Sequence, residues 1–204
     1  MKTYTQIWQR LCSFENLERA FRRARRRKTK KVYVQEFEKN LHDNLEQLHV
    51  ELLFHSYQPR PLKTFIIRDP KTRKISKADF RDRVIHHALY NVIDLMFENT
   101  FIYDSFANQK GKGTVKAIER FDQFKRKVYN KKTEQGYVLK ADIKHYFEEI
   151  DHNILLSILK RKIKDERVLW LIKKIMRSQQ NGGGRTRSSV GKSHVTVLCQ
   201  YIFE

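Results

Sequence analysis

The segment from Arg81 to Phe101 restricts the fold more than any other part of the sequence. In RDRVIHHALYNVIDLMFENTF, apolar residues recur on almost every side of a helix: Val84, Ile85, Ala88, Leu89, Val92, Ile93, Met96 and Phe97. A helix that is apolar all round has to be surrounded by other elements. The segment therefore predicts a core helix. The adjacent His86 and His87 face different ways on it, and we interpret them as core or surface residues, not metal ligands.

The composition is sufficient for such a core. The chain has 204 residues, of which 40% are hydrophobic and 12% aromatic, which indicates one or two folded domains and excludes a disordered chain. Two cysteines, Cys12 and Cys199, are too few for a disulfide framework or a zinc site, so we interpret both as packing residues. The sequence shows no signal peptide and no apolar run long enough to span a bilayer, so we expect a cytoplasmic protein without a membrane partner.

The charge indicates a polyanionic partner. Lys and Arg number 43 against 23 Asp and Glu, giving a net charge of +20. Nucleic acid is the first candidate. A membrane surface is the second, but the basic residues are spread along the chain and there is no lipidation motif.

Residues 1–60 are expected to form a helical basic region. In NLERAFRRARRRKTKK, apolar residues lie on one side of a helix, beside a dense basic block of Arg22, Arg23, Arg25, Arg26, Arg27 and Lys28. Such runs usually form a solvated face, but this one continues into Lys30 and Lys31, which favours phosphate contact. From Val34, a helical period of apolar residues predicts one long core-facing helix to about His55.

A β-hairpin is predicted after this helix. The prolines of YQPRP end the helix, because proline cannot continue its hydrogen-bond ladder. LKTFIIRDPKTRKISKADF then has β-branched and aromatic residues on one arm and turn residues at Asp69, Pro70 and Lys71. The tip is strongly basic, with Arg68, Lys71, Arg73, Lys74 and Lys77.

The remaining motifs predict an α+β fold. NQKGKGT departs from the phosphate-loop pattern, although backbone N–H groups at the helix start that follows can contact phosphate. GTVKAIERFDQFKRKVYN predicts an amphipathic helix and GYVLKADI a buried strand. DHNILLSILKRKIKDERVLWLIKKIM predicts a helical pair with Asp151 as the N-cap. Helices and hairpins alternate without a repeat, which is typical of α+β proteins.

Asp142 is the candidate for metal chemistry. It ends the apolar run VLKAD, and a carboxylate at the end of a strand can hold a hard cation such as Mg²⁺. Phosphoryl transfer needs such carboxylates, because paired ions stabilise the attacking and leaving oxygens. Without further context, an aspartate at the end of a strand, such as Asp142, is a solvent-exposed residue about as often as it is a metal ligand.

The sequence resembles the reverse transcriptases of group II introns and bacterial retroelements, including diversity-generating elements. The resemblance runs from about Asn16 to Ser178, in FIIRDPKTRKISKADFRDRVIHHAL, FENTFIYDSFANQKGKGTVKAIER and VLKADIKHYFEEIDHNILLSILKRKI. It implies a right-hand polymerase with fingers over residues 61–135 and the first part of a palm, with an incomplete sheet, over residues 136–180. The implied activity is RNA-directed DNA polymerisation, with Mg²⁺ as cofactor and an RNA template, an RNA–DNA hybrid and dNTPs as partners.

The resemblance also implies roles for single residues. Asp142 matches the first metal-binding aspartate, the Ile143 carbonyl would be a neighbouring ligand, and Phe147 matches the steric gate that selects deoxynucleotides.

The resemblance also implies that basic residues contact the incoming nucleotide and the nucleic-acid backbone. Arg73 matches the fingertip arginine along the incoming triphosphate, with Lys71 or Arg68 assisting. Lys110, Lys112 and the basic block would follow the template or primer backbone.

Two blocks of the family are missing, namely L-P-x-G-x-x-T-S-Q and Y-x-D-D. No two aspartates are adjacent in the chain, so the two-metal mechanism lacks ligands and the chain is expected to be inactive alone. With suitable wobble bases, Arg187 to Glu204 translated one nucleotide further on gives GLPLGNLTSQFFANIYL, which is the first missing block. We therefore expect residues 181–204 to be a frameshifted, non-native tail. The alternative is a non-catalytic, maturase-like RNA-binding module.

Overall fold

The described part of the chain is mostly helical. The computed structural model describes residues 3–68, 72–97, 101–107, 109, 111–130, 136–142 and 151–180. Its helices are α1 (Trp8–Cys12), α2 (Phe14–Arg25), α3 (Val32–Lys39), α4 (Leu41–Leu53), α5 (Phe80–Phe97), α6 (Thr114–Asn130), α8 (His152–Lys162) and α9 (Glu166–Gln180). Strands β1 (Lys63–Ile67) and β2 (Arg73–Lys77) form a two-stranded antiparallel sheet. These elements agree broadly with the predicted α+β class.

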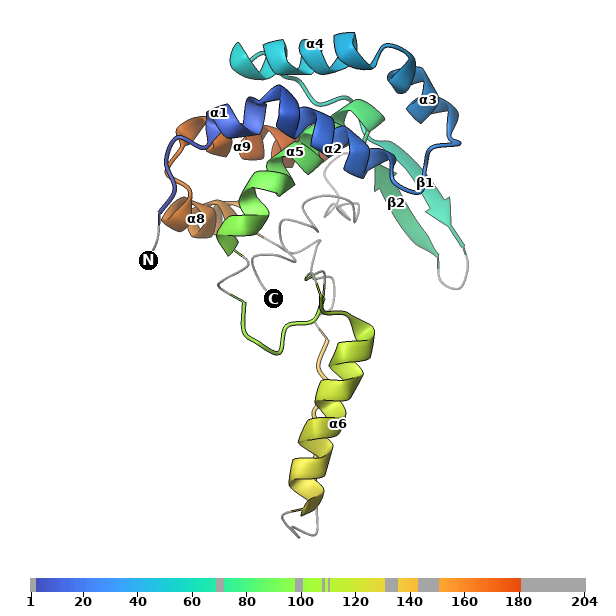
Figure 1. Cartoon of the computed structure of the whole chain (residues 1–204), viewed down its shortest axis with the longest axis vertical. Coiled ribbons are helices and arrows are strands. Elements are labelled where there is room, and N and C mark those ends of the chain that lie inside the picture. Colours follow the sequence, from blue (N-terminus) through green and yellow to red (C-terminus); the bar gives the residue numbers. More distant parts are fainter. Residues whose placement is uncertain are drawn as a thin grey trace.

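Helix α5 is the centre of the core, as its sequence predicts. The eight apolar residues named above, from Val84 to Phe97, are all buried. Helices α1 and α2 pack along it, and α9 lies behind it (Figure 1). Asn16 of α2 fixes this packing through its side-chain amide, which donates to the carbonyls of Leu11 (2.8 Å) and Ala88 (3.1 Å). The core therefore joins segments that are far apart in the sequence.

The single long helix predicted from Val34 to His55 is wrong in one respect. The chain forms two helices, α3 and α4, which are separated at Asn40 by a backbone with φ −118° and ψ 50°. The Asn44 side chain donates to the Phe37 carbonyl at 2.9 Å, which satisfies an oxygen that the broken helix leaves open. The apolar period continues across the break, so periodicity does not reveal it.

The predicted hairpin arms are confirmed. Lys63 to Ile67 pair with Lys77 to Arg73, and the arms extend from the helical body (Figure 1). The predicted turn at residues 69–71 lies outside the described residues. The apolar side chains of β1 are not covered by the core, since Ile66 is 60% exposed.

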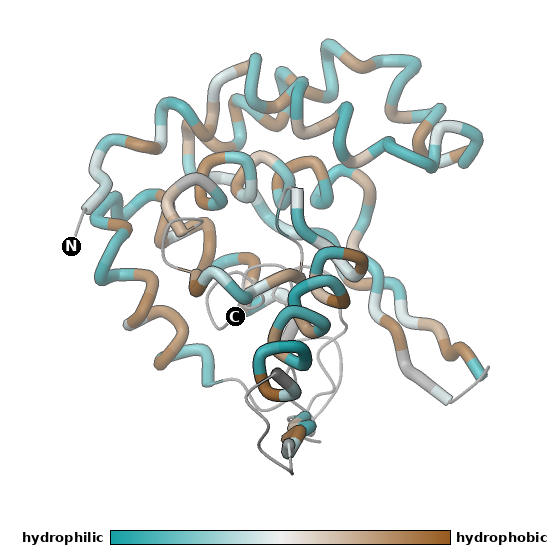
Figure 2. Tube along the Cα trace, turned by 60° about the horizontal axis from the view of Figure 1, so that its bottom comes forward, coloured by the Kyte–Doolittle hydropathy of each residue, from teal (hydrophilic) through white to brown (hydrophobic). Residues whose placement is uncertain are grey.

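Helix α6 projects from the body (Figure 1) and carries apolar and polar residues side by side (Figure 2). Ile118, Phe121, Phe124 and Val128 are all exposed, so its amphipathic pattern is present without a covering element among the described residues.

The buried strand predicted over GYVLKADI is wrong. Residues 136–142 have no strand structure and are exposed, with Leu139 at 92%. A strand needs a neighbour that takes up its backbone hydrogen bonds. The described residues offer no partner strand at this place, because their single sheet consists of β1 and β2.

The C-terminal helical pair closes the core. As predicted, Asp151 caps α8 by accepting from the backbone N–H groups of Asn153 (2.7 Å) and Ile154 (3.2 Å). The buried Asp165 accepts from the Trp8 N–H at 2.9 Å, which ties the start of α1 to the start of α9. Cys12 is buried beside this contact, and burial raises the pKa of its thiol to about 12, as expected for a packing residue. Cys199 lies outside the described residues.

The described helices include no candidate for a membrane span, as none is long and apolar enough.

Candidate nucleic-acid interface

Half of the basic block is held by partners within the protein. Arg22 pairs with Glu18 at 2.5 Å, and Arg25 pairs with Glu38 at 2.5 Å. Arg23 donates to Asn91 of α5. Arg25 and Arg23 therefore help to hold α2 against α3 and α5, whereas the Arg22 pair lies within α2.

The other half of the block forms the turn after α2. The N–H of Arg26 donates to the Arg23 carbonyl, and Arg27 has a φ of 61°, so the chain reverses here. Arg26 and Arg27 are exposed, whereas Lys28 turns back and is half-buried. Burial, followed by the charge of Arg83, lowers the pKa of Lys28. Arg26 and Arg27 are thus the members of the block that are open to a phosphate backbone.

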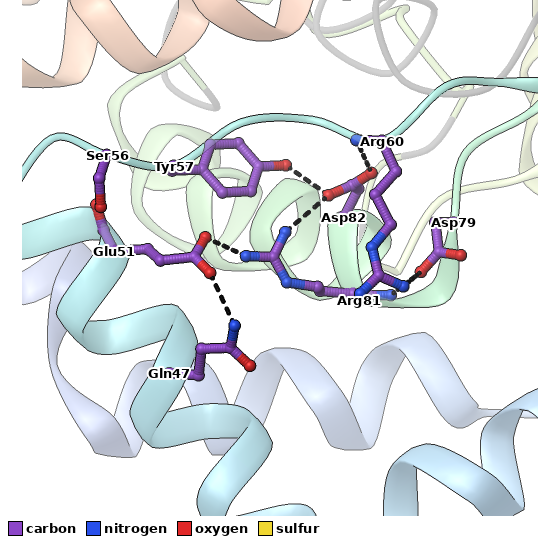
Figure 3. Close-up of polar contacts among 8 residues, drawn as sticks. All are labelled: Gln47, Glu51, Ser56, Tyr57, Arg60, Asp79, Arg81 and Asp82. Atoms are coloured by element: carbon purple, nitrogen blue, oxygen red, sulfur yellow. Dashed lines mark hydrogen bonds and ion pairs between the residues drawn. The ribbon is translucent and has the colours of Figure 1, made fainter.

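The hairpin is anchored at its base by a buried polar network (Figure 3). Asp82 accepts from the Tyr57 hydroxyl (2.9 Å) and from the Arg60 N–H (2.8 Å). Arg60 also pairs with Asp79 at 3.3 Å, which joins the two chain segments that lead into and out of the hairpin. Arg81 donates to Glu51 of α4 and lies 3.5 Å from Asp82. Together these contacts fix the direction in which the hairpin leaves the body.

Arg68 and Arg73, two of the predicted triphosphate residues, lie at the far end of this hairpin. Arg68 is exposed and directly follows β1. The backbone of Arg73 begins β2 opposite Ile67, so the positions of Arg68 and Arg73 are close. Lys71 lies outside the described residues. Contact of these residues with a triphosphate stays a prediction.

Lys112 supports the loop that precedes α6. Its ammonium group donates to the carbonyls of Tyr103 (2.6 Å) and Ser105 (2.9 Å), and it lies 5.2 Å from the centre of the Tyr103 ring. Lys112 therefore has a structural role that the sequence did not indicate. Lys110 lies outside the described residues.

A second cation, Arg120, stacks beside the same loop. Arg120 lies over the rings of Tyr103 (5.2 Å) and Phe124 (4.5 Å) and donates to Asp104 at 2.6 Å. This hydrogen bond lowers the pKa of Asp104. Exposed aromatic rings next to basic groups are typical of surfaces that bind single-stranded nucleic acid.

The predicted Mg²⁺ site is not complete within the described residues. Asp142 is exposed at the end of the segment 136–142, while Ile143 and Phe147 lie outside the described part. The described part contains no group of three or more His, Cys, Asp or Glu side chains that could hold a metal. One exposed carboxylate does not fit the ligand number that Mg²⁺ requires.

The residues of the hairpin anchor were not predicted from the sequence. Tyr57, Asp82 and Arg81 are separated in the chain and have no motif of their own. A weak signal was available, since RDR is a charged group in the first turn of a helix that is otherwise largely apolar.

Comparison with known proteins gives distant matches. No family model matches the chain. It is 26% identical over 141 residues to Protein YkfC of Escherichia coli (strain K12), covering 66% of this chain. It is 24% identical over 136 residues to the putative COX1/OXI3 intron 1 protein of Saccharomyces cerevisiae, and 23% identical over 113 residues to the putative intron 2 protein, covering 66% and 53% of this chain.

The chain is distantly similar to intron-encoded proteins. The matched region spans 35% of YkfC, and 16% and 12% of the two yeast proteins, so the chain spans about a third of these relatives or less.

Proposed function

We propose that this chain carries the fingers and the first part of the palm of a retroelement reverse transcriptase of the group II intron type, and that its described surface binds RNA. The similarity to two intron-encoded proteins carries this proposal. It agrees with the three sequence blocks that resemble that family.

The charge distribution supports binding to a nucleic-acid backbone. The chain has a net charge of +20, and Arg26, Arg27 and Arg68 are exposed at the α2 turn and at the end of β1. Such contacts neutralise phosphates and release counterions, so they give affinity without sequence recognition. The stacked Tyr103, Arg120 and Phe124 add a platform on which unpaired bases can stack.

The polymerase reaction of the parent enzyme would be attack of a primer 3′-OH on a dNTP. Asp142 would be one of its metal ligands, Phe147 would exclude ribonucleotides, and Arg73 would hold the triphosphate. Mg²⁺ would neutralise the developing phosphate charge once the remaining carboxylates are present. Since the chain lacks the Y-x-D-D block, we expect it to bind RNA but not to extend a primer.

A non-catalytic, maturase-like RNA-binding module is the second candidate. It is favoured because Asp142 is exposed and belongs to no group of three or more potential metal ligands among the described residues.

Two assays on the purified chain test the proposal. RNA binding is measured by fluorescence anisotropy with a single-stranded RNA, in parallel with an acidic polymer of similar length as a control for charge. Preferential binding of RNA supports the interface, and equal binding of the two polymers contradicts it. Template-dependent incorporation of dNTPs by the chain alone would contradict the expected inactivity.

A further inference from the structure

At the base of the hairpin, a group of basic side chains has no ion-pair partner within the part of the chain that the structure describes. It consists of Arg83 at the start of α5, Lys77 at the end of β2 and Lys28 in the turn after α2, arranged around Tyr33 of α3. The Arg83 guanidinium lies 5.1 Å and the Lys77 ammonium 4.1 Å from the centre of the Tyr33 ring. Lys28 lies close enough to interact electrostatically with Arg83, Tyr33 and Lys77, so cations from the α2 turn, β2 and α5 gather in one place.

Arg83 has unused hydrogen-bond donors. Its side chain is buried, with 6% of the residue exposed, and its Nε and Nη2 atoms have no acceptor among the described residues. Within this part of the chain, no ion pair joins Arg83, Lys77 or Lys28 to a carboxylate. An isolated buried charge is unfavourable unless something pairs with it.

The neighbouring groups respond to this positive charge. Burial, and then the charges of Lys28, Arg23 and Arg83, lower the pKa of His87 to about 4. Burial tends to raise the pKa of Tyr33, but hydrogen bonding and the charges of Arg83 and Lys77 outweigh it and lower that pKa. The positive charges around Tyr33 contribute to both shifts.

We propose that Arg83, Lys77 and Lys28 form a binding site for one phosphate group. The guanidinium of Arg83 offers two free N–H directions, which match the geometry of a phosphate oxygen pair. The two lysines add charge from the side of the hairpin and from the α2 turn. The Nε and Nη2 atoms of Arg83 are covered, so binding of a phosphate requires neighbouring side chains to move outward.

The same chemistry has two sources, a free phosphate and a phosphate of a nucleic-acid backbone. The proposal does not depend on polymerase activity, because the site needs only the anion. Inorganic pyrophosphate and a short single-stranded RNA are therefore the two probes, each titrated into the full chain at constant ionic strength.

The variants are Arg83→Met and Lys77→Met, with Arg19→Met as the matched control. Arg19 is exposed on α2 and pairs with Glu15 at 2.6 Å, away from the group around Tyr33. We expect Arg83→Met to weaken binding of the relevant probe about tenfold, since a hydrogen bond to a charged group contributes a factor of that order. Lys77→Met should weaken it less, and Arg19→Met should leave it unchanged.

The thermal midpoint of the ligand-free protein distinguishes a phosphate-binding role of Arg83 from a purely structural one. Removing a buried cation that lacks a partner should leave the ligand-free thermal midpoint of Arg83→Met unchanged or raised, whereas a supporting role would lower it. If Arg83→Met does not fold, Lys77→Met carries the test with the same probes.

The two probes separate the two sources. Loss of pyrophosphate binding alone assigns the site to a free phosphate, loss of RNA binding alone assigns it to a backbone phosphate, and loss of both shows that it accepts either. If both variants bind both probes as tightly as the wild-type chain, or if neither probe binds the wild type, the proposal is overturned.

Discussion

The Tyr57 hydroxyl donates a 2.9 Å hydrogen bond to Oδ1 of Asp82, in the buried space between the end of α4 and the start of α5. The other oxygen of Asp82 accepts from the Arg60 N–H at 2.8 Å. Burial raises the pKa of Asp82, and the two hydrogen bonds oppose that shift. Asp82, which follows the hairpin in the chain, is therefore held by two residues that precede it (Figure 3).

Tyr57→Phe should lower the free energy of unfolding by about 1–3 kcal/mol, because it leaves a buried carboxylate oxygen with fewer donors. Urea unfolding followed by circular dichroism measures the change. Tyr129→Phe is the control, since Tyr129 is exposed on α6 and should change stability little. An equal effect of the two variants would contradict the proposed importance of the buried contact.

The two histidines of α5 should make the protein less stable in mild acid. Burial lowers the pKa of His86 to about 3 and that of His87 to about 4, from a usual value of 6.5. The unfolded chain then takes up protons that the folded chain does not, so stability present above pH 6.5 is lost as the pH falls toward the folded pKa values, by about 1.4 kcal/mol per pH unit for each histidine.

His87→Gln should flatten this dependence between pH 6 and pH 4, as measured by urea unfolding at several pH values. His42→Gln is the control, because His42 is exposed on α4 and its replacement should leave the slope as it is. A wild-type stability that does not change over this range would show that both histidines are protonated in the folded state.

Asp165→Ala should destabilise the contact between the two ends of the described core by about 1–3 kcal/mol. Asp165 is buried and accepts hydrogen bonds from the N–H groups of Trp8 (2.9 Å) and Arg167 (3.2 Å), and the variant leaves both donors without this acceptor. Asp165→Asn keeps an oxygen acceptor and should retain part of the stability in a thermal melt. If Asp165→Asn loses as much stability as Asp165→Ala, the charge of Asp165, and not its acceptor oxygen, is important.

RNA affinity should fall steeply with salt, with log K linear in log salt concentration. Arg26→Gln should reduce the magnitude of that slope by about 1, because one phosphate contact is lost. Arg19→Gln should leave the slope unchanged, since Arg19 is paired with Glu15. Fluorescence anisotropy at several salt concentrations measures this, and a flat response of the wild type would remove the electrostatic basis of the interface.

The reading frame gives a prediction at the level of the gene. The DNA read in the other frame past the codons for Gly182 to Gly184 should encode the template-contacting block and then a Y-x-D-D turn. A single-nucleotide change that joins the frames should produce a Mg²⁺-dependent reverse transcriptase, in which Asp142→Ala abolishes incorporation and Phe147→Ala mainly relaxes discrimination against ribonucleotides. Sequencing that DNA is the first measurement, and absence of such a turn in every frame would refute the frameshift.

Local signals account for the elements that the sequence reading obtained correctly. The apolar residues of α5, the prolines before β1 and the Asp151 cap act within a few residues of themselves, so their effects follow from spacing. The same holds for the basic block at the end of α2 and in the turn that follows, because its charge follows directly from the sequence.

Contacts between distant segments account for the rest. The strand expected over residues 136–142 has no partner strand among the described residues, and its apolar pattern alone cannot supply one. Tyr57 and Asp82, or Lys28 and Arg83, become neighbours because α2, α3 and the hairpin pack around α5. Whether a charged side chain is paired, exposed or buried without a partner depends on that packing, because burial and the local field arise from atoms that are remote in the sequence.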